Sequence, residues 1–132
     1  MIRLPQHIID GIIEQARREL PDEACGLLVG SGNEIKKQYP LTNIDHSPEH
    51  FSFDPREQFA VLREARAAGL SIVANYHSHP SSPAHPSAED IRLAYDSEIL
   101  YLILSLQDTD NPVLKAFSIK DGVANEVTIQ HL

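Results

Sequence analysis

The sequence predicts a single domain over residues 1–132, of the α/β or α+β class, with a mixed, largely antiparallel sheet between helices. A length of 132 residues allows one hydrophobic core but is short for two ordinary domains. Segments with helical and with strand periodicity alternate, without a regular strand-helix-strand spacing. Short turns join several of the strand segments, and such turns connect antiparallel neighbours.

An amphipathic helix and a hairpin are expected first. Apolar residues recur at helical spacing between Pro5 and Pro21, which predicts a helix there. The apolar run 24–29 predicts a strand, and turn residues at 30–33 connect it to a second strand over 34–41. The polar side of the helix is expected to contain Asp10, Glu14, Gln15 and Arg18.

A second helix is expected after a loop over 43–48 and a brief strand over 51–53, where apolar and polar residues alternate. Asp54 is placed as its N-cap, with Pro55 in the first helical position and Glu57 completing a capping box. Its apolar side begins with Phe59, and Gly69 is expected to end the helix.

The second half of the chain predicts further strands and one short helix. A buried strand begins at 72–74 and delivers His77 and His79 at its far end, before a loop with three prolines. The third helix is short and starts with Ser87 as its cap. The remaining strands are expected over 99–106, 113–119 and, after an Asp121-Gly122 turn, 123–129.

The charge balance argues against nucleic acid as a partner. The chain has 19 acidic and 11 basic side chains, and the formal charge of -8 repels a phosphate backbone. No apolar stretch approaches the length of a membrane span, and the first residues lack a secretion signal. Cys25 is the only cysteine, so no internal disulfide can form. We therefore expect a cytoplasmic protein that binds neither nucleic acid nor membrane.

Two histidines separated by one residue form the most informative pattern of the chain. Side chains alternate along a strand, so His77 and His79 lie on one side of it and can both reach one metal ion. Asp90 would add a carboxylate ligand. Two imidazoles and one carboxylate leave the fourth position of Zn2+ open, which is the ligand count of a catalytic zinc site. The pattern therefore predicts a metal-dependent hydrolase.

Ser87 and Glu23 are the candidate catalytic residues. Ser87 has two compatible roles, because it can cap the third helix and its hydroxyl can also stabilise an oxygen that becomes charged in a transition state. A buried carboxylate with a raised pKa suits the transfer of a proton from a metal-activated water. Glu23 has the right side chain for this task, but sequence spacing alone does not bring it to the metal.

Together these residues resemble the JAMM metalloproteases, the catalytic branch of the MPN (Mov34/PAD-1) family. Glu23, the run His77-Ser78-His79-Pro80, Ser87 and Asp90 match the pattern E…H-[ST]-H-x7-S-x-x-D. Segments 23–30 and 80–86 are also similar to those of small bacterial and archaeal members. The resemblance covers nearly the whole chain and implies an MPN-type, cytidine-deaminase-like fold with a curved mixed sheet.

The resemblance also implies residue roles and a substrate. It implies that His77, His79 and Asp90 bind zinc, that Glu23 is the general acid and base, and that Ser87 stabilises the tetrahedral intermediate. Family members cleave peptide or isopeptide bonds beside the C-terminal Gly-Gly of ubiquitin or ubiquitin-like proteins. Small prokaryotic members resemble enzymes that release cysteine from a ubiquitin-like sulfur carrier. The expected partner is therefore a ubiquitin-like or sulfur-carrier protein that ends in Gly-Gly.

Several alternatives stay open at the level of sequence. An MPN-type module could bind a carrier protein without cleaving it, and a peptidase could act on another substrate. A zinc deaminase would need a P-C-x-x-C segment, which one cysteine cannot supply. Cys25 lies in an apolar run, where burial makes a thiol inert. The sequence does not assign roles to His85 or to the segment Asn43–Phe53, which could flank the cleft, and it does not indicate an oligomeric state.

Overall fold

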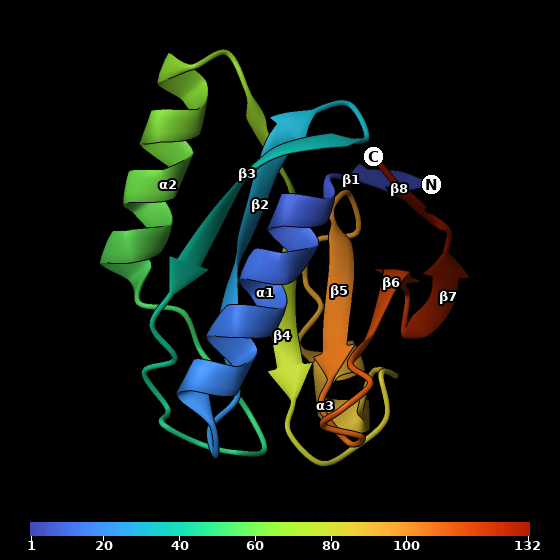
Figure 1. Cartoon of the computed structure of the whole chain (residues 1–132). Coiled ribbons are helices and arrows are strands. Elements are labelled where there is room, and N and C mark those ends of the chain that lie inside the picture. Colours follow the sequence, from blue (N-terminus) through green and yellow to red (C-terminus); the bar gives the residue numbers. More distant parts are fainter.

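The computed structural model describes residues 1–132 as one eight-stranded sheet with helices on both of its faces (Figure 1). None of these helices is long and apolar enough to cross a membrane. The helices are α1 (Gln6–Glu19), α2 (Pro55–Ala67) and α3 (Ala88–Arg92). The strands are β1 (Ile2–Leu4), β2 (Cys25–Ser31), β3 (Glu34–Leu41), β4 (Ser71–His79), β5 (Leu100–Ser105), β6 (Val113–Lys120), β7 (Val123–Val127) and β8 (Ile129–His131).

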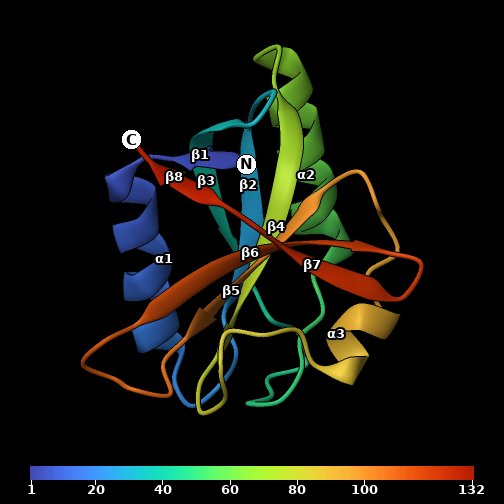
Figure 2. The same ribbon diagram turned by 90° about the vertical axis from the view of Figure 1, so that its right-hand side faces the viewer.

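The sheet is mixed and curved, which confirms the predicted fold class. Its strand order is β7-β6-β5-β4-β2-β3-β1-β8. Four neighbouring pairs are antiparallel, whereas β4–β5, β3–β1 and β1–β8 are parallel. In the rotated view, β6 and β7 run across the direction of β2 and β4, and α1 lies on the opposite side of the sheet from α2 and α3 (Figure 2).

Alternation along the strands divides the core between the two faces of the sheet. On one face, Ile12 of α1 belongs to a buried cluster with Leu28 and Tyr76. On the other face, Val61 of α2 packs in a cluster with Leu27. Since Tyr76 of β4 faces α1, the residues directly before and after it face α2 and α3. The last residues of β4 therefore present alternate side chains to the face on which α3 lies.

The two ends of the chain pair with each other at one edge of the sheet. β1 is parallel to β8, with Ile2 opposite Ile129, and its other neighbour is β3. The side chains of Ile2 and Leu4 are fully buried. The sequence predicts no strand at 2–4, and it predicts one strand over 123–129 where the structure has β7 and β8. Strands of three residues are too short for period-two alternation to reveal them.

The helix α1 has the predicted span, but the prediction for Gln15 is wrong. Gln15 is buried rather than exposed on the polar side of the helix. Its amide donates to the carbonyl oxygen of Cys25 at 2.9 Å, and it accepts a hydrogen bond from the Tyr76 hydroxyl. Gln38 of β3 also donates to the Tyr76 hydroxyl, at 3.0 Å. A buried amide is stable in this core because its hydrogen-bonding groups are paired.

Around α2, the predicted cap is confirmed and two other predictions are wrong. Asp54 accepts a hydrogen bond from the backbone N–H of Arg56, as an N-cap does. Glu57 does not complete a capping box, because its carboxylate binds the backbone N–H and the hydroxyl of Thr42 at 2.8 and 2.9 Å. Phe59 is not part of the buried side and remains 58% exposed, with the Arg63 guanidinium 5.7 Å from its ring centroid.

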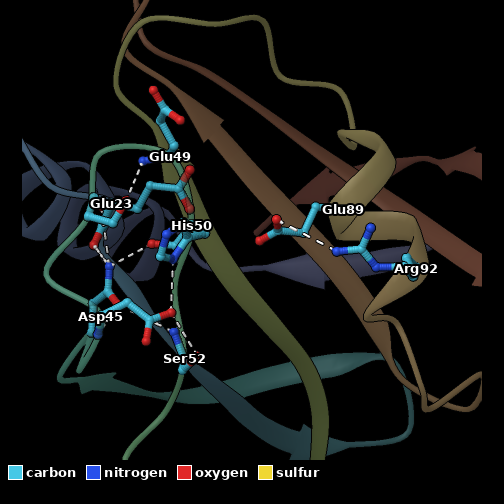
Figure 3. Close-up of polar contacts among 9 residues, drawn as sticks. Glu23, Asp45, Glu49, His50, Ser52, Glu89 and Arg92 are labelled. Carbon is cyan, nitrogen blue, oxygen red and sulfur yellow. Dashed lines mark hydrogen bonds and ion pairs between the residues drawn. The ribbon is translucent and has the colours of Figure 1, made fainter.

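The segment before α2 is a loop rather than a strand. The expected strand over 51–53 is reduced to one isolated bridge between Phe53 and Asn43. Side-chain hydrogen bonds hold this loop instead of a strand ladder. Asp45 accepts hydrogen bonds from the ring of His50 and from the hydroxyl of Ser52, at 3.0 and 2.8 Å (Figure 3).

Candidate metal centre and active site

The end of β4 carries the two histidines into the space beside α3. β4 lies between β2 and β5, so its backbone is hydrogen-bonded on both sides. His77 and His79 project from the same face because they are two residues apart. Ser78 projects from the other face, where its hydroxyl accepts a hydrogen bond from the backbone N–H of Ala24 at 2.8 Å. Both imidazoles are buried.

Asp90 completes a group of three possible metal ligands. One carboxylate oxygen, Oδ2, lies 3.2 Å from Nε2 of His77 and 3.1 Å from Nε2 of His79. The two Nε2 atoms are 3.1 Å apart. In a tetrahedral zinc site with metal–ligand distances of about 2.0–2.2 Å, the donors are about 3.3–3.5 Å apart. The three side chains therefore fit a zinc ion with small adjustments.

The ring of His79 is oriented for metal binding by a bond on its far side. Its Nδ1 lies 2.8 Å from the carbonyl oxygen of Pro83, in the proline-rich loop after β4. A carbonyl can only accept, so Nδ1 carries a proton, and Nε2 is the ring nitrogen that can offer a lone pair to a metal ion. His77 is held differently, since its ring stacks on Phe51 at 4.6 Å and its buried Nδ1 has no hydrogen-bond partner.

The hydrogen bonds that cap α3 also hold Asp90 in position. The backbone N–H of Asp90 donates to the hydroxyl oxygen of Ser87 at 3.0 Å, and the backbone N–H of Ser87 donates to Oδ2 of Asp90 at 2.9 Å. This is a capping box, so the predicted capping role of Ser87 is confirmed. The hydroxyl of Ser87 accepts in this bond, which leaves its proton available to a substrate oxygen.

Burial and close charges shift the pKa values of all three candidate ligands. Burial is the largest influence on His77 and lowers its pKa. Burial also opposes the charged form of His79, but hydrogen bonds to Asp90 and to the Pro83 carbonyl outweigh it and raise the pKa of His79. Burial opposes ionisation of Asp90 as well, yet hydrogen bonds from both histidines hold its pKa well below the usual range. Asp90 is therefore an anion, as a ligand must be.

Glu23 lies between α1 and β2, in the segment that leads into the sheet. It is only 4% exposed, and its Oε1 has no hydrogen-bond partner. Burial raises its pKa from 4.5 to about 8, while His79 opposes the rise and Asp90 adds to it. The structure shows this electrostatic coupling but no hydrogen bond between Glu23 and the three candidate ligands. A carboxyl that titrates near neutral pH can both accept and donate a proton.

A cleft of about 470 Å³ begins at these residues. His77 and Asp90 line it, and Phe51, Leu27, Ile72 and Ile103 contribute apolar walls. Its only charged lining residues are acidic: Glu89, Asp90 and Asp96. An apolar cleft with a few convergent polar groups at one end is typical of a substrate site.

The other candidate residues lie outside this group. Burial raises the pKa of the Cys25 thiol to about 12, so the thiol is not a nucleophile near neutral pH. His85 is exposed and meets the edge of the Phe117 ring, with 5.7 Å between the ring centroids. Asn43 and Phe51 lie near the site, in the segment 43–53 that the sequence suggests as a flank of the cleft without assigning roles to its residues. Their contacts join positions far apart in sequence, so no local pattern reveals them.

The fold and the site define a hydrolase of the JAMM type. The family described as prokaryotic homologs of the JAB domain matches residues 5–120. The chain belongs to this family, in agreement with the resemblance seen in its sequence.

Named relatives agree with this assignment, and a solved structure shares the fold. The chain is 34% identical to a CysO-cysteine peptidase of Mycobacterium tuberculosis over 121 residues, which are 90% of this chain and 83% of the relative. It is 31% identical to a desampylase of Pyrococcus furiosus over 102 residues, 77% and 72% of the two chains. The solution structure of a Desulfitobacterium hafniense protein is 46% identical, covers 100% of this chain and 93% of that one, and has a TM-score of 0.92.

Proposed function

We propose that the protein is a zinc-dependent peptidase that hydrolyses a peptide or isopeptide bond at the C-terminal Gly-Gly of a ubiquitin-like carrier protein, with a sulfur carrier as the first candidate. The convergence of three donor atoms within 3.2 Å, from His77, His79 and Asp90, is the observation that carries the proposal. The name of the mycobacterial relative supports a carrier joined to cysteine as substrate, and the name of the archaeal relative supports removal of a conjugated modifier.

The residues of the chain divide the proposed reaction between them. Bound zinc would polarise the scissile carbonyl and make water more acidic. Glu23 takes the proton of the attacking water, because its buried carboxyl has a pKa near neutrality. The hydroxyl of Ser87 donates to the oxygen of the attacked carbonyl as that oxygen gains negative charge. Glu23 then gives that proton to the departing amine, so the elements of water are divided between a carboxyl group on the carrier and a free amine on the product.

The cleft supports an extended tail as the part of the substrate that binds. Its walls are apolar and its charged residues are acidic, which excludes a site built for phosphate or nucleic acid. A glycine pair has no side chains, so a tail of this kind can bring its scissile carbonyl close to buried histidines. We place the C-terminal residues of the carrier along this cleft, with the bond to be cleaved beside His77 and Asp90.

The test uses the zinc-loaded protein and two substrates. One is a ubiquitin-like carrier that ends in Gly-Gly and is extended by cysteine, and the other is the same carrier joined to a lysine side chain. Mass spectrometry should show release of the carrier ending in Gly-Gly from at least one of them. Chelation should stop the reaction and added zinc should restore it.

Two controls decide between the proposal and its alternatives. A carrier whose Gly-Gly is replaced by Val-Val should remain intact. If Glu23→Gln cleaves as fast as the parent, the assigned role of Glu23 is wrong. If the protein binds the carrier tightly and leaves both substrates uncut, it is a binding module and the peptidase proposal fails.

A further inference from the structure

Asn43 is the centre of a buried group of hydrogen bonds beside Glu23. It is 9% exposed, and both ends of its amide make hydrogen bonds. Its Oδ1 accepts from the backbone N–H of Asp45 at 3.0 Å and of Ser52 at 3.3 Å. Its Nδ2 donates to the carbonyl oxygen of Glu23 at 3.0 Å and to that of His50 at 3.1 Å. One side chain therefore joins the loop 43–53 to Glu23, two residues before β2.

This loop makes hydrogen bonds to both backbone groups of Glu23, the N–H and the carbonyl oxygen. The N–H of Glu23 donates to the carbonyl oxygen of Ser47 at 2.8 Å, and its carbonyl oxygen accepts from Asn43. Glu23 is outside any helix or strand, so no ladder fixes it. The next residue, Ala24, is held by β4 instead of the loop. The N–H of Ala24 donates to the hydroxyl of Ser78, and the carbonyl oxygen of Ala24 accepts from the N–H of Ser78.

The carboxylate of Glu23 has no comparable restraint of its own. Its Oε1 is buried without a hydrogen-bond partner, so burial and the course of the backbone determine where it points. Figure 3 shows Glu23 beside the loop that carries Asp45, His50 and Ser52. Displacing a reacting group by about 1 Å can cost on the order of 100-fold in rate.

We propose that Asn43 is a positioning residue for Glu23. The inference rests on the proposed function, in which Glu23 moves the proton. The two ends of the amide have separate tasks: Oδ1 shapes the loop, which also carries Phe51 onto the ring of His77, and Nδ2 holds the carbonyl of Glu23. Nothing in Asn43 touches the three candidate metal ligands, so its effect passes through Glu23 and the loop alone.

Two substitutions separate these tasks. Asn43→Ala removes both, whereas Asn43→Asp keeps the oxygen that accepts from Asp45 and Ser52 but cannot donate to Glu23. The control is Ile35→Ala, a buried position on β3 that faces α1 and destabilises the fold without touching the site. All variants are compared with the parent as zinc-loaded, folded protein.

We expect kcat on the carrier substrate to fall about 10- to 100-fold in both Asn43 variants, with KM and zinc per chain unchanged in Asn43→Asp, which keeps the bonds that shape the loop. Ile35→Ala should keep the parent kcat. The inference is overturned if Asn43→Ala keeps the parent kcat, if Asn43→Asp restores it, or if lost zinc or a raised KM explains the whole effect.

Amide hydrogen exchange gives a readout that does not depend on activity. In both Asn43 variants the N–H of Glu23 should exchange at least about 10-fold faster relative to the amides of β5, because its segment opens locally. Ile35→Ala should instead change the amides of the core together. Unchanged relative exchange at Glu23 would overturn the inference. If the parent cleaves no carrier, the proposed function fails, and the exchange data still decide whether Asn43 tethers Glu23.

Discussion

The substitution Glu23→Gln is expected to abolish activity and to stabilise the metal-free protein at alkaline pH. Glu23 is a buried carboxyl whose Oε1 has no hydrogen-bond partner. Ionising such a group inside the protein is costly, and its pKa is therefore raised from 4.5 to about 8. Glutamine has nearly the same shape and never carries the charge.

The size and sign of the change in the free energy of unfolding follow from the difference between the folded and unfolded pKa of Glu23. A pKa that rises from 4.5 to about 8 corresponds to an upper bound of about 5 kcal/mol. We expect about 2–3 kcal/mol, because relaxation of the protein around a buried ion lowers the cost of its charge. Between these two pH values the folded chain keeps the Glu23 proton and the unfolded chain releases it. Raising the pH through this window therefore destabilises the parent, and the loss is complete above pH 8.

The test is urea unfolding between pH 4 and pH 9. It measures the free energy of unfolding of the metal-free parent and of metal-free Glu23→Gln. The difference between the two free energies of unfolding isolates Glu23, since the other titrating groups are common to both chains. It should grow in favour of Glu23→Gln as the pH rises, and then level off above pH 8. A difference that is the same at every pH would refute the reasoning. In the zinc-loaded protein, the same change should lower kcat by about 100- to 10,000-fold.

Three further substitutions test the ligands, the cap and the core. Asp90→Asn should weaken zinc binding more than about 100-fold, because losing a metal ligand costs more than losing a residue that is hydrogen-bonded to a ligand. Titration against a zinc chelator measures the zinc affinity. Ser87→Ala should lower the free energy of unfolding by about 1 kcal/mol, because the cap is lost, and should lower kcat by about 100-fold. If each folded molecule keeps the parent kcat, Ser87 only caps the helix. Gly26→Ala should lower the free energy of unfolding by about 1–3 kcal/mol in thermal denaturation, because the added Cβ would lie 2.3 Å from the hydroxyl oxygen of the buried Tyr76.

The parts of the fold that sequence could predict are those governed by local rules. The turn between β2 and β3, the Asp121-Gly122 turn and the caps at Asp54 and Ser87 all depend on residues within a few positions of each other. The pairing of β1 with β8 depends on residues from opposite ends of the chain, and no local pattern encodes it.

The same division applies to the site. The spacing of His77 and His79 is local, so the strand period alone places them together. Asp90 reaches them because the loop 80–86 and the cap of α3 fold back, and spacing along the sequence suggests this ligand without showing that fold-back. Asn43 was not recognisable, since its partners at Glu23 and Ser52 are 20 and 9 positions away and become neighbours only when the loop closes.

Because α3 is short, the proposed metal site and the shape of the cleft depend on each other. It has five residues, none of them buried, so it is too short to hold its form by itself. What anchors it is the capping box, and the carboxylate in that box is the same one offered to the metal. If Asp90 binds zinc as proposed, zinc binding and the order of α3 are thermodynamically coupled. A substrate that packs against α3 would then raise the affinity for zinc, and bound zinc would raise the affinity for that substrate by the same factor.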